Sequence, residues 1–521
     1  MSIRRFCLST VVIGLLAGAS VAQEGGNTNT MDMALAAGWK AGFVCSGTFT
    51  AKQDLNTIER NDLSGIYPDF QRDYDRLPEP KIDKAKKTVS VVYDTNMPPR
   101  IAAWRPGFGC TQLPIGADEA QLEFLPRFGS WPNSTSQDRG SAIGSNVKIQ
   151  LRTEEAERLE APVSFAFDER TYGNGTRTSA VLVVKDGQVV AEQYARGVTH
   201  ETPQRTWSVA KSLTATIIGA GIRNGHTNID YPAVIADWNN GADPRRTITL
   251  RNLLNMASGL DSGENGSRTD RIYFGGARVI DEAASSPLEA TPGTRFKYAN
   301  NDTLIAMRSL RESMKDDSAF HAFPYQRLLH KIGATHTTIE TDWDGDLISS
   351  SQVWSTARDL ARVGQLYLQD GLWGSERILP KGWAKFVSTP APAQPDSGAG
   401  YGAQFWLMTD AEVPEGTYYM AGNRGQYVVI VPSMNTVIVR RGYDVIGGAR
   451  FNINDFARDI LLSLQAAEDE RLAERVLIET MEAEIESTII AEKARSERKK
   501  QAIRERIMQK YDRLPAPVAA E

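Results

Sequence analysis

The order of strand-like and helix-like segments along the chain is the feature that most constrains its fold. Runs rich in Val and Ala within 179–195 flank Asp186-Gly187, a dipeptide that favours a type I′ hairpin turn because both central residues of that turn need positive φ. An apolar helix-like run follows over 208–223, and strand-like runs return between 403 and 441. This order predicts an α+β fold: an antiparallel sheet flanked by helices and completed by strands from the far end of the chain, with a helical subdomain inserted between.

Composition places the chain among ordinary globular proteins and argues against one class of partner. Its 521 residues include 41% hydrophobic and 24% charged side chains, and the formal net charge is −5. A nucleic-acid-binding surface needs a local excess of Lys and Arg, whereas the one dense basic run, Arg495–Arg506, is interleaved with glutamates. We therefore expect no nucleic-acid partner.

The first 22 residues have the pattern of a secretory signal peptide. Arg4 and Arg5 precede an apolar run over 6–17, and small residues follow over 20–22. The run is shorter than the ~20 apolar residues that a membrane-spanning helix needs. We therefore expect residues 1–22 to be a signal peptide, the mature protein to be periplasmic or secreted, and no membrane span.

The cysteines fit an exported protein. Cys7 lies inside the predicted signal peptide, which leaves Cys45 and Cys110 in the mature chain. In an oxidising compartment, two remaining cysteines more often form a structural disulfide bond than a reactive pair. Residues 23–150 contain both cysteines and several Pro- and Gly-rich loops but no histidine, so we predict a disulfide-stapled region with a structural role.

Residues 466–521 are predicted to form a charged helical tail. Apolar residues recur there at spacings of three to four; they are Leu472, Val476, Leu477, Met481, Ile485 and Ile489. Charged residues dominate the rest of the segment, which predicts an exposed helix that docks on the protein's own surface or contacts a partner. The segment 151–465 is then the domain that carries the chemistry.

A serine followed three residues later by a lysine occurs three times, but only one copy has a setting in which the two side chains can cooperate. Ser145–Lys148 lies in an alternating, extended stretch, where residues three apart point to opposite faces. Ser496–Lys499 lies in the charged tail, where water keeps the lysine protonated. Ser208–Lys211 begins the apolar helix-like run, where residues three apart share a face and the helix N-terminus adds positive potential. We predict that Ser208 is the nucleophile and Lys211 its activator.

A tyrosine segment is the second candidate element. Tyr298-Ala-Asn300 precedes another helix-like run. A tyrosine with a reference pKa of ~10 works as a base only beside positive charge, which Lys211 can supply. Tyr172-Gly-Asn174 matches the same short pattern but lies in a glycine-rich turn, ahead of the serine in the chain.

The third candidate element is a glycine-rich bend between two strands, at Met420-Ala-Gly422. Glycine permits a substrate carbonyl to approach backbone N–H groups closely. A plain hairpin turn is the alternative interpretation of this segment.

Taken in this order, the three elements resemble those of the β-lactamase-related serine hydrolases, which include class C β-lactamases, DD-peptidases, carboxylesterases of the same fold and 6-aminohexanoate-dimer hydrolases. The resemblance covers residues 178–465 and includes the hairpin ahead of the serine. It also includes Leu253–Leu260, which is similar to the family's LLxHTSGL loop, with Met256 where a histidine is common. The resemblance implies a β-lactamase/transpeptidase-like fold.

The resemblance also implies a role for each residue of the first two elements. Ser208 corresponds to the acylated nucleophile and Lys211 to its activator. Tyr298 would protonate the leaving group, and Asn300 would bind both the lysine and the substrate.

The third element completes the implied site and departs from the family. The oxyanion hole would consist of the backbone N–H groups of Ser208 and Asn423, beside Gly422. Where the family usually has Lys or His, this chain has Met420, and Arg424 is the nearby cation that could substitute. The lost cation argues against β-lactamase and peptidoglycan-peptidase activity more than against acyl transfer.

These observations predict an exported serine hydrolase that forms an acyl-enzyme with small esters or linear amides. Two alternatives stay open: a non-catalytic binding protein with the penicillin-recognising fold, and a β-lactamase or D-amino-acid peptidase. A Ser-His-Asp hydrolase is not indicated, because the chain has no G-x-S-x-G segment and none of its five histidines has a distinctive motif around it. No H-E-x-x-H or paired-ligand spacing occurs, so neither a metal nor another cofactor is expected.

Overall fold

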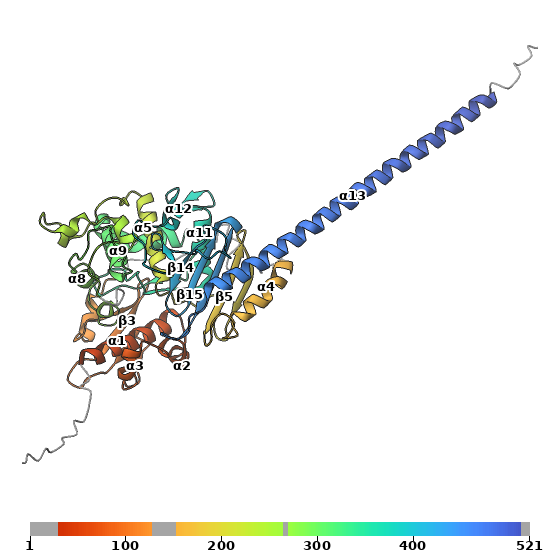
Figure 1. Cartoon of the computed structure of the whole chain (residues 1–521). Coiled ribbons are helices and arrows are strands. Elements are labelled where there is room, and N and C mark those ends of the chain that lie inside the picture. The colour runs from red at the N-terminus through yellow and green to blue at the C-terminus, as the bar shows by residue number, and fades with distance from the viewer. Residues whose placement is uncertain (1–29, 128–152, 264–268, 512–521) are drawn as a thin grey trace, which may run out of the picture.

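The computed structural model describes residues 30–127, 153–263 and 269–511. The predicted signal peptide and the Ser145–Lys148 segment lie outside the described residues. Figure 1 shows a body built around one large sheet with helices on both faces, from which a single long helix projects.

Within the described residues, the large sheet has seven strands, and neighbouring strands are antiparallel. In spatial order the strands are β12 (Gly400–Tyr401), β13 (Trp406–Leu407), β14 (Tyr418–Gly422), β15 (Gln426–Val431), β16 (Thr436–Gly442), β5 (Thr178–Lys185) and β6 (Gln188–Tyr194). β16, from the far end of the chain, pairs with β5 and places Val439 opposite Leu182. The predicted α+β fold, with a sheet completed by C-terminal strands, is therefore confirmed.

The β5–β6 hairpin turns as the sequence predicts. Asp186 has φ 53° and Gly187 has φ 75°, so both lie in the left-handed region that a type I′ turn requires. A Cβ atom on Gly187 would meet nothing within 4 Å, so glycine is favoured there for its φ and not for space.

Alternation along the strands gives the sheet two apolar faces. Val428 belongs to one hydrophobic core and its neighbour Val429 to the other, as the two-residue period of a strand requires. The covering helices are α5 (Val209–Arg223) and α11 (Ala357–Leu368) on the first face, and α4 (Thr153–Phe165) and the start of α13 (Ile453–Tyr511) on the second. The sheet is therefore the middle of three layers.

The predicted helical subdomain lies between β6 and β12. Besides α5 and α11 it contains α6 (Leu250–Leu254), α7 (Asp270–Tyr273), α8 (Val279–Ala283), α9 (Asn300–Met314), α10 (Asp317–Pro324) and α12 (Trp383–Ser388). Two small sheets accompany them: β7 (Gln204–Arg205), β9 (Val353–Ser355) and β8 (Thr338–Ile339) form one, and β10 (Leu372–Trp373) with β11 (Glu376–Arg377) forms the other. α9 packs against both α5 and α6, which brings the tyrosine segment next to the serine.

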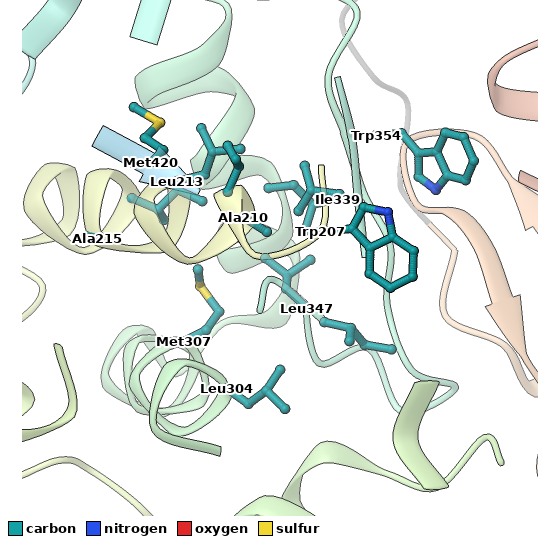
Figure 2. Packing of buried hydrophobic residues seen from close by; sticks show 14 of the residues in the cluster. Trp207, Ala210, Leu213, Ala215, Leu304, Met307, Ile339, Leu347, Trp354 and Met420 are labelled. Carbon is teal, nitrogen blue, oxygen red and sulfur yellow. The ribbon is translucent and has the colours of Figure 1, made fainter. Parts of the chain in front are cut away.

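The N-terminal region shares a core with the main body. α1 (Thr30–Cys45) packs against a four-stranded antiparallel sheet. The strands are β1 (Lys81–Asp83), β2 (Thr88–Val91), β3 (Arg100–Arg105) and β4 (Gly109–Gln112), and the short helices α2 (Leu55–Ile58) and α3 (Pro68–Tyr74) lie between α1 and β1 in the chain. Trp39 of α1 stacks on Phe274 with 4.4 Å between ring centroids, and it belongs to the same apolar cluster as Trp207 and Leu213. Figure 2 shows Trp207 and Leu213 in this cluster. The region therefore supports the chain around α5 directly.

The predicted disulfide bond is confirmed. Cys45, the last residue of α1, is bonded to Cys110 in β4, with a sequence separation of 65 residues. Restricting so long a loop in the unfolded chain stabilises the folded state by about 4 kcal/mol in the chain-entropy model.

α13 has a docked part and a projecting part. One face is buried as far as Ala467, and an ion pair of 3.2 Å between Arg471 and Glu155 ties the next turn to α4. From Leu472 onward the helix projects away from the body (Figure 1). Of the helices that the structure describes, none combines a membrane-spanning length with a sufficiently apolar sequence.

Candidate active site

Ser208 lies at the N-terminus of α5, directly after a residue in an unusual conformation. Trp207 has φ 50°, a left-handed value that is unfavourable for a bulky side chain. Packing holds it there: the Arg205 guanidinium lies 4.2 Å from its ring, and Trp39 of α1 lies 6.3 Å away. Ser208 caps the helix, and within the described residues its N–H has no backbone acceptor. The helix N-terminus thus offers a free donor beside the hydroxyl group.

Lys211 is buried one turn into α5 and has three acceptors around it. Its Nζ lies 3.2 Å from Ser208 Oγ, 2.5 Å from Asn300 Oδ1 and 2.9 Å from the Ser350 carbonyl oxygen. These three acceptor oxygens equal in number the three N–H donors of a protonated lysine. Burial lowers the pKa of Lys211 from 10.5 to about 7. A large share of the amine is therefore neutral near pH 7 and able to accept a proton from the serine.

Tyr298 contacts the same hydroxyl group. Its phenol lies near enough to Ser208 for that side chain to lower its pKa, and Lys211 Nζ lies 5.1 Å from its ring centroid. The ring stacks on Trp406 of β13 at 5.5 Å and meets Tyr401 edge-on at 6.1 Å. Desolvation raises the pKa of Tyr298 well above 10, and the Ser208 side chain lowers it only in part. Tyr298 is therefore a neutral phenol near pH 7, which can donate a proton.

The loop after α6 positions the tyrosine from both sides. Met256 is fully buried with φ 55°. Its carbonyl oxygen accepts the N–H of Lys297 at 2.8 Å, and its Sδ accepts the N–H of Ala299 at 3.4 Å. The thioether therefore still provides an acceptor where the family usually has a histidine.

The end of β14 passes close to the backbone of Ser208. A Cβ atom on Gly422 would lie 2.4 Å from the Thr206 carbonyl oxygen and 3.1 Å from the Ser208 nitrogen, so glycine alone permits this approach. β13 pairs with only the first two residues of β14, so its last three have β15 on one side and, within the described residues, no strand on the other. Asn423 follows directly. An oxyanion hole made of the Ser208 and Asn423 N–H groups requires such an approach.

We expect Gly422→Ala to lower kcat for a small ester by about 10²–10³, because the added methyl group moves β14 away from the serine and loosens one oxyanion donor. The matched control is Gly241→Ala, whose Cβ would meet nothing within 4 Å. Steady-state kinetics on variants with native near-UV circular dichroism measure the effect. An unchanged kcat in Gly422→Ala would show that this strand end is not part of the site.

Two side chains of the third element do not supply a cation to the site. Met420 is fully buried and lies beside Leu213 of α5 (Figure 2). Arg424 is also buried, and its guanidinium donates to the carbonyl oxygens of Asp62 at 2.9 Å and Ser64 at 2.8 Å. It donates to the Asp444 carbonyl oxygen as well, at 2.9 Å. Arg424 is therefore not available to replace the family's cation.

A cleft of about 780 Å³ opens beside Ser208. Its aromatic lining residues are Tyr67, Tyr298, Trp406, Tyr419, Tyr427 and Phe451. Tyr67 comes from the N-terminal region, and its hydroxyl accepts the Asn423 Nδ2–H at 3.0 Å. The exposed Arg450 also lines the cleft. The N-terminal region thus contributes directly to the cleft wall, which sequence analysis did not predict.

The other matches to the sequence patterns lie elsewhere. Tyr172 donates to Asp459 at 2.9 Å and packs against Phe456, in the core on the second face of the sheet. Ser496–Lys499 is exposed on the projecting part of α13. The structure thus brings together Ser208 with its predicted partners and leaves the alternatives outside.

Ser350 is a residue of the site that sequence analysis missed. Its carbonyl oxygen accepts from Lys211, and its hydroxyl lies 2.5 Å from the Tyr273 hydroxyl. A backbone carbonyl leaves no signal in a sequence, because every residue has one. Within the described ranges, no group of three or more His, Cys, Asp or Glu residues is placed to hold a metal ion. A hydroxyl group beside a buried amine, a neutral phenol and free backbone donors is an arrangement that can perform acyl transfer.

Comparison with known proteins identifies the family. The Beta-lactamase family model matches residues 164–440, which is more than half of the chain. The chain therefore belongs to the beta-lactamase family, and the resemblance to β-lactamase-related serine hydrolases is confirmed.

Individual relatives agree with this assignment. The 6-aminohexanoate-dimer hydrolase of Paenarthrobacter ureafaciens is 25% identical over 301 residues, which cover 51% of this chain and 72% of that protein. An uncharacterized protein of Alkalihalophilus pseudofirmus is 21% identical over 284 residues, 50% of this chain and 82% of that protein. The solved structure of a "putative 6-aminohexanoate-dimer hydrolase" from Bacillus anthracis covers 59% of this chain and 82% of its own, with 21% identity and a TM-score of 0.50. The chain is thus a hydrolase of the β-lactamase fold.

Proposed function

We propose that this protein is an exported serine hydrolase that forms an acyl-enzyme at Ser208 and acts on small esters or linear amides. The observation that carries the proposal is the buried amine of Lys211, with a pKa of about 7, at 3.2 Å from Ser208 Oγ. A nucleophilic serine needs a base whose pKa lies near the working pH. The Cys45–Cys110 bond supports export, because such bonds persist in oxidising compartments.

Acylation begins when neutral Lys211 accepts the Ser208 proton as Oγ attacks the substrate carbonyl carbon. The carbonyl oxygen becomes an oxyanion, which accepts hydrogen bonds from the N–H groups of Ser208 and Asn423. Positive potential at the start of α5 adds to this stabilisation.

Collapse of the tetrahedral intermediate breaks the bond to the leaving group. Tyr298 donates its proton to the leaving oxygen or nitrogen, and the Lys211 ammonium returns a proton to the phenolate. Both groups contact Ser208, so the proton crosses only a short distance. Water then attacks the acyl-enzyme carbonyl and gives its proton to neutral Lys211. The bond to Ser208 Oγ breaks, the acid leaves, and the Lys211 ammonium returns the proton to Oγ.

The cleft supports a preference for substrates without a carboxylate beside the scissile bond. Six of its lining residues are aromatic, Met420 is buried, and the donors of Arg424 are engaged. The relative from Paenarthrobacter ureafaciens is named for a linear amide substrate, which agrees with this preference. Arg450 is the observation that favours the β-lactamase alternative, because it is an exposed cation in the cleft lining.

We expect kcat/KM for p-nitrophenyl butyrate to exceed that for nitrocefin. A charge-assisted hydrogen bond is worth ~1.5–3 kcal/mol, so its absence should cost carboxylate-bearing substrates roughly 10- to 150-fold. Arg450→Ala is the companion variant, because it removes the exposed cation without touching Ser208. Faster hydrolysis of nitrocefin than of the ester, with a loss of that activity in Arg450→Ala, would contradict the preference and assign the carboxylate to Arg450.

A further inference from the structure

The projecting part of α13 carries a stripe of apolar side chains that touches nothing else in the described chain. Six large residues lie on one side of the helix, and each is between 46% and 57% exposed: Ile478, Met481, Ile485, Ile489, Ile503 and Ile507. Single exposed apolar residues are normal, but a stripe along a helix marks a face that packs against a partner. A projecting helix also gains little stability without such packing.

The spacing of the stripe suits a second helix. Its positions follow steps of three, four and four residues, an 11-residue repeat of 3.67 residues per turn. Glu492, Ser496 and Lys500 occupy the remaining positions of the repeat. Polar residues at the seam of paired helices fix the register and the orientation of the partner.

Charge along the helix indicates what the partner is. Residues 476–492 contain five Glu and no Lys or Arg, a net charge of −5. The next 17 residues, 493–509, contain seven Lys or Arg and two Glu, a net charge of +5. A parallel partner of the same sequence would place like charges side by side, whereas an antiparallel one places each acidic half against a basic half. An anionic membrane would attract one half and repel the other.

We propose that α13 pairs antiparallel with α13 of a second copy of this chain, with the pair centred between Glu492 and Lys493. In this register Ile478 of one copy lies opposite Ile507 of the other at each end of the pair, and Ile485 lies opposite Lys500 nearer its middle. The two bodies then lie roughly 65 Å apart at a rise of 1.5 Å per residue. The clefts of the two copies stay independent of each other.

Sedimentation velocity of the full chain tests the pairing. We expect a dimer whose dissociation constant increases with salt, because the opposite charges are screened. Ile507→Asp should raise this constant on the order of 100-fold, since it places a negative charge against Ile478 in the acidic half of the partner and each dimer carries the change twice. The matched control is Ile490→Asp, another exposed isoleucine that lies outside the stripe, which should leave the dimer intact. A chain that ends after Arg471 should be monomeric and keep its ester turnover.

Cysteine cross-linking tests the orientation. A mixture of Ile478→Cys and Ile507→Cys chains should form the mixed disulfide bond, and Ile478→Cys alone should not cross-link. Three results would overturn the proposal: a full chain that stays monomeric at 100 times the concentration used for sedimentation, cross-linking of Ile478→Cys with itself, or equal effects of Ile507→Asp and Ile490→Asp. So would binding to phosphatidylserine vesicles by a chain that stays monomeric in solution.

Discussion

Replacing Ser208 by alanine should lower kcat/KM for p-nitrophenyl butyrate by at least about 10⁴, because no other group of the site can form the acyl-enzyme. The alanine keeps the helix N-terminus and both N–H groups, so substrate binding and oxyanion stabilisation should leave a small residual rate. The effect should therefore appear in kcat and not in KM.

The matched control for this variant is Ser496→Ala, which removes the serine of the exposed Ser-x-x-Lys segment on α13. It should be indistinguishable from the wild type in ester hydrolysis. A Ser208→Ala protein that folds normally and keeps more than a tenth of the wild-type rate would show that the chemistry lies elsewhere, whereas a folded wild type without turnover would favour a protein that only binds its ligand.

Replacing Lys211 by methionine should lower kcat by about 10³, the typical loss when a general base is removed. Methionine fills the same buried space without a charge, so the fold should survive the change. The Ser350 carbonyl and Asn300 Oδ1 lose a donor, which a modest drop in melting temperature would report. A loss of stability without a loss of kcat would mean that Lys211 is structural.

The pH dependence of the wild type provides the second half of this test. Burial lowers the pKa of Lys211 to about 7, and only the neutral amine accepts a proton, so kcat/KM should rise as the pH increases through about 7. The pKa of Tyr298 is raised well above 10, so its proton stays in place over this range. Lys211→Arg, which cannot lose its proton near neutrality, should lack the rise and stay at the low rate.

Much of the fold and of the site is predictable from the sequence, because short stretches of the chain specify both the local secondary structure and the positions of the reactive side chains. Asp186-Gly187 specifies its turn through φ, and the apolar run predicted to be helical from Ser208 is a helix from Val209, with Ser208 as its N-cap. The spacing of Ser208 and Lys211 then places both on one helix face. Asn300, which begins α9, binds the lysine as the family resemblance implies.

The remaining parts depend on contacts between distant segments, which leave no local pattern. Tyr67 lines the cleft only because the N-terminal region packs against the hairpin end at Asn423, 356 residues further along the chain. Ser350 contributes a carbonyl oxygen, which any residue could supply. Met420 stands where the family places a cation, but burial beside α5 decides its role, and burial emerges only from the packed structure.

The most direct test of acyl-enzyme formation at Ser208 is covalent labelling of the full protein with a fluorophosphonate, followed by intact mass measurement and peptide mapping. One label per chain on Ser208, absent from Ser208→Ala and slower at pH 5 than at pH 8, is the expected result. Label on any other serine, or no label on a folded protein at pH 8, would contradict the assignment of Ser208 as the nucleophile.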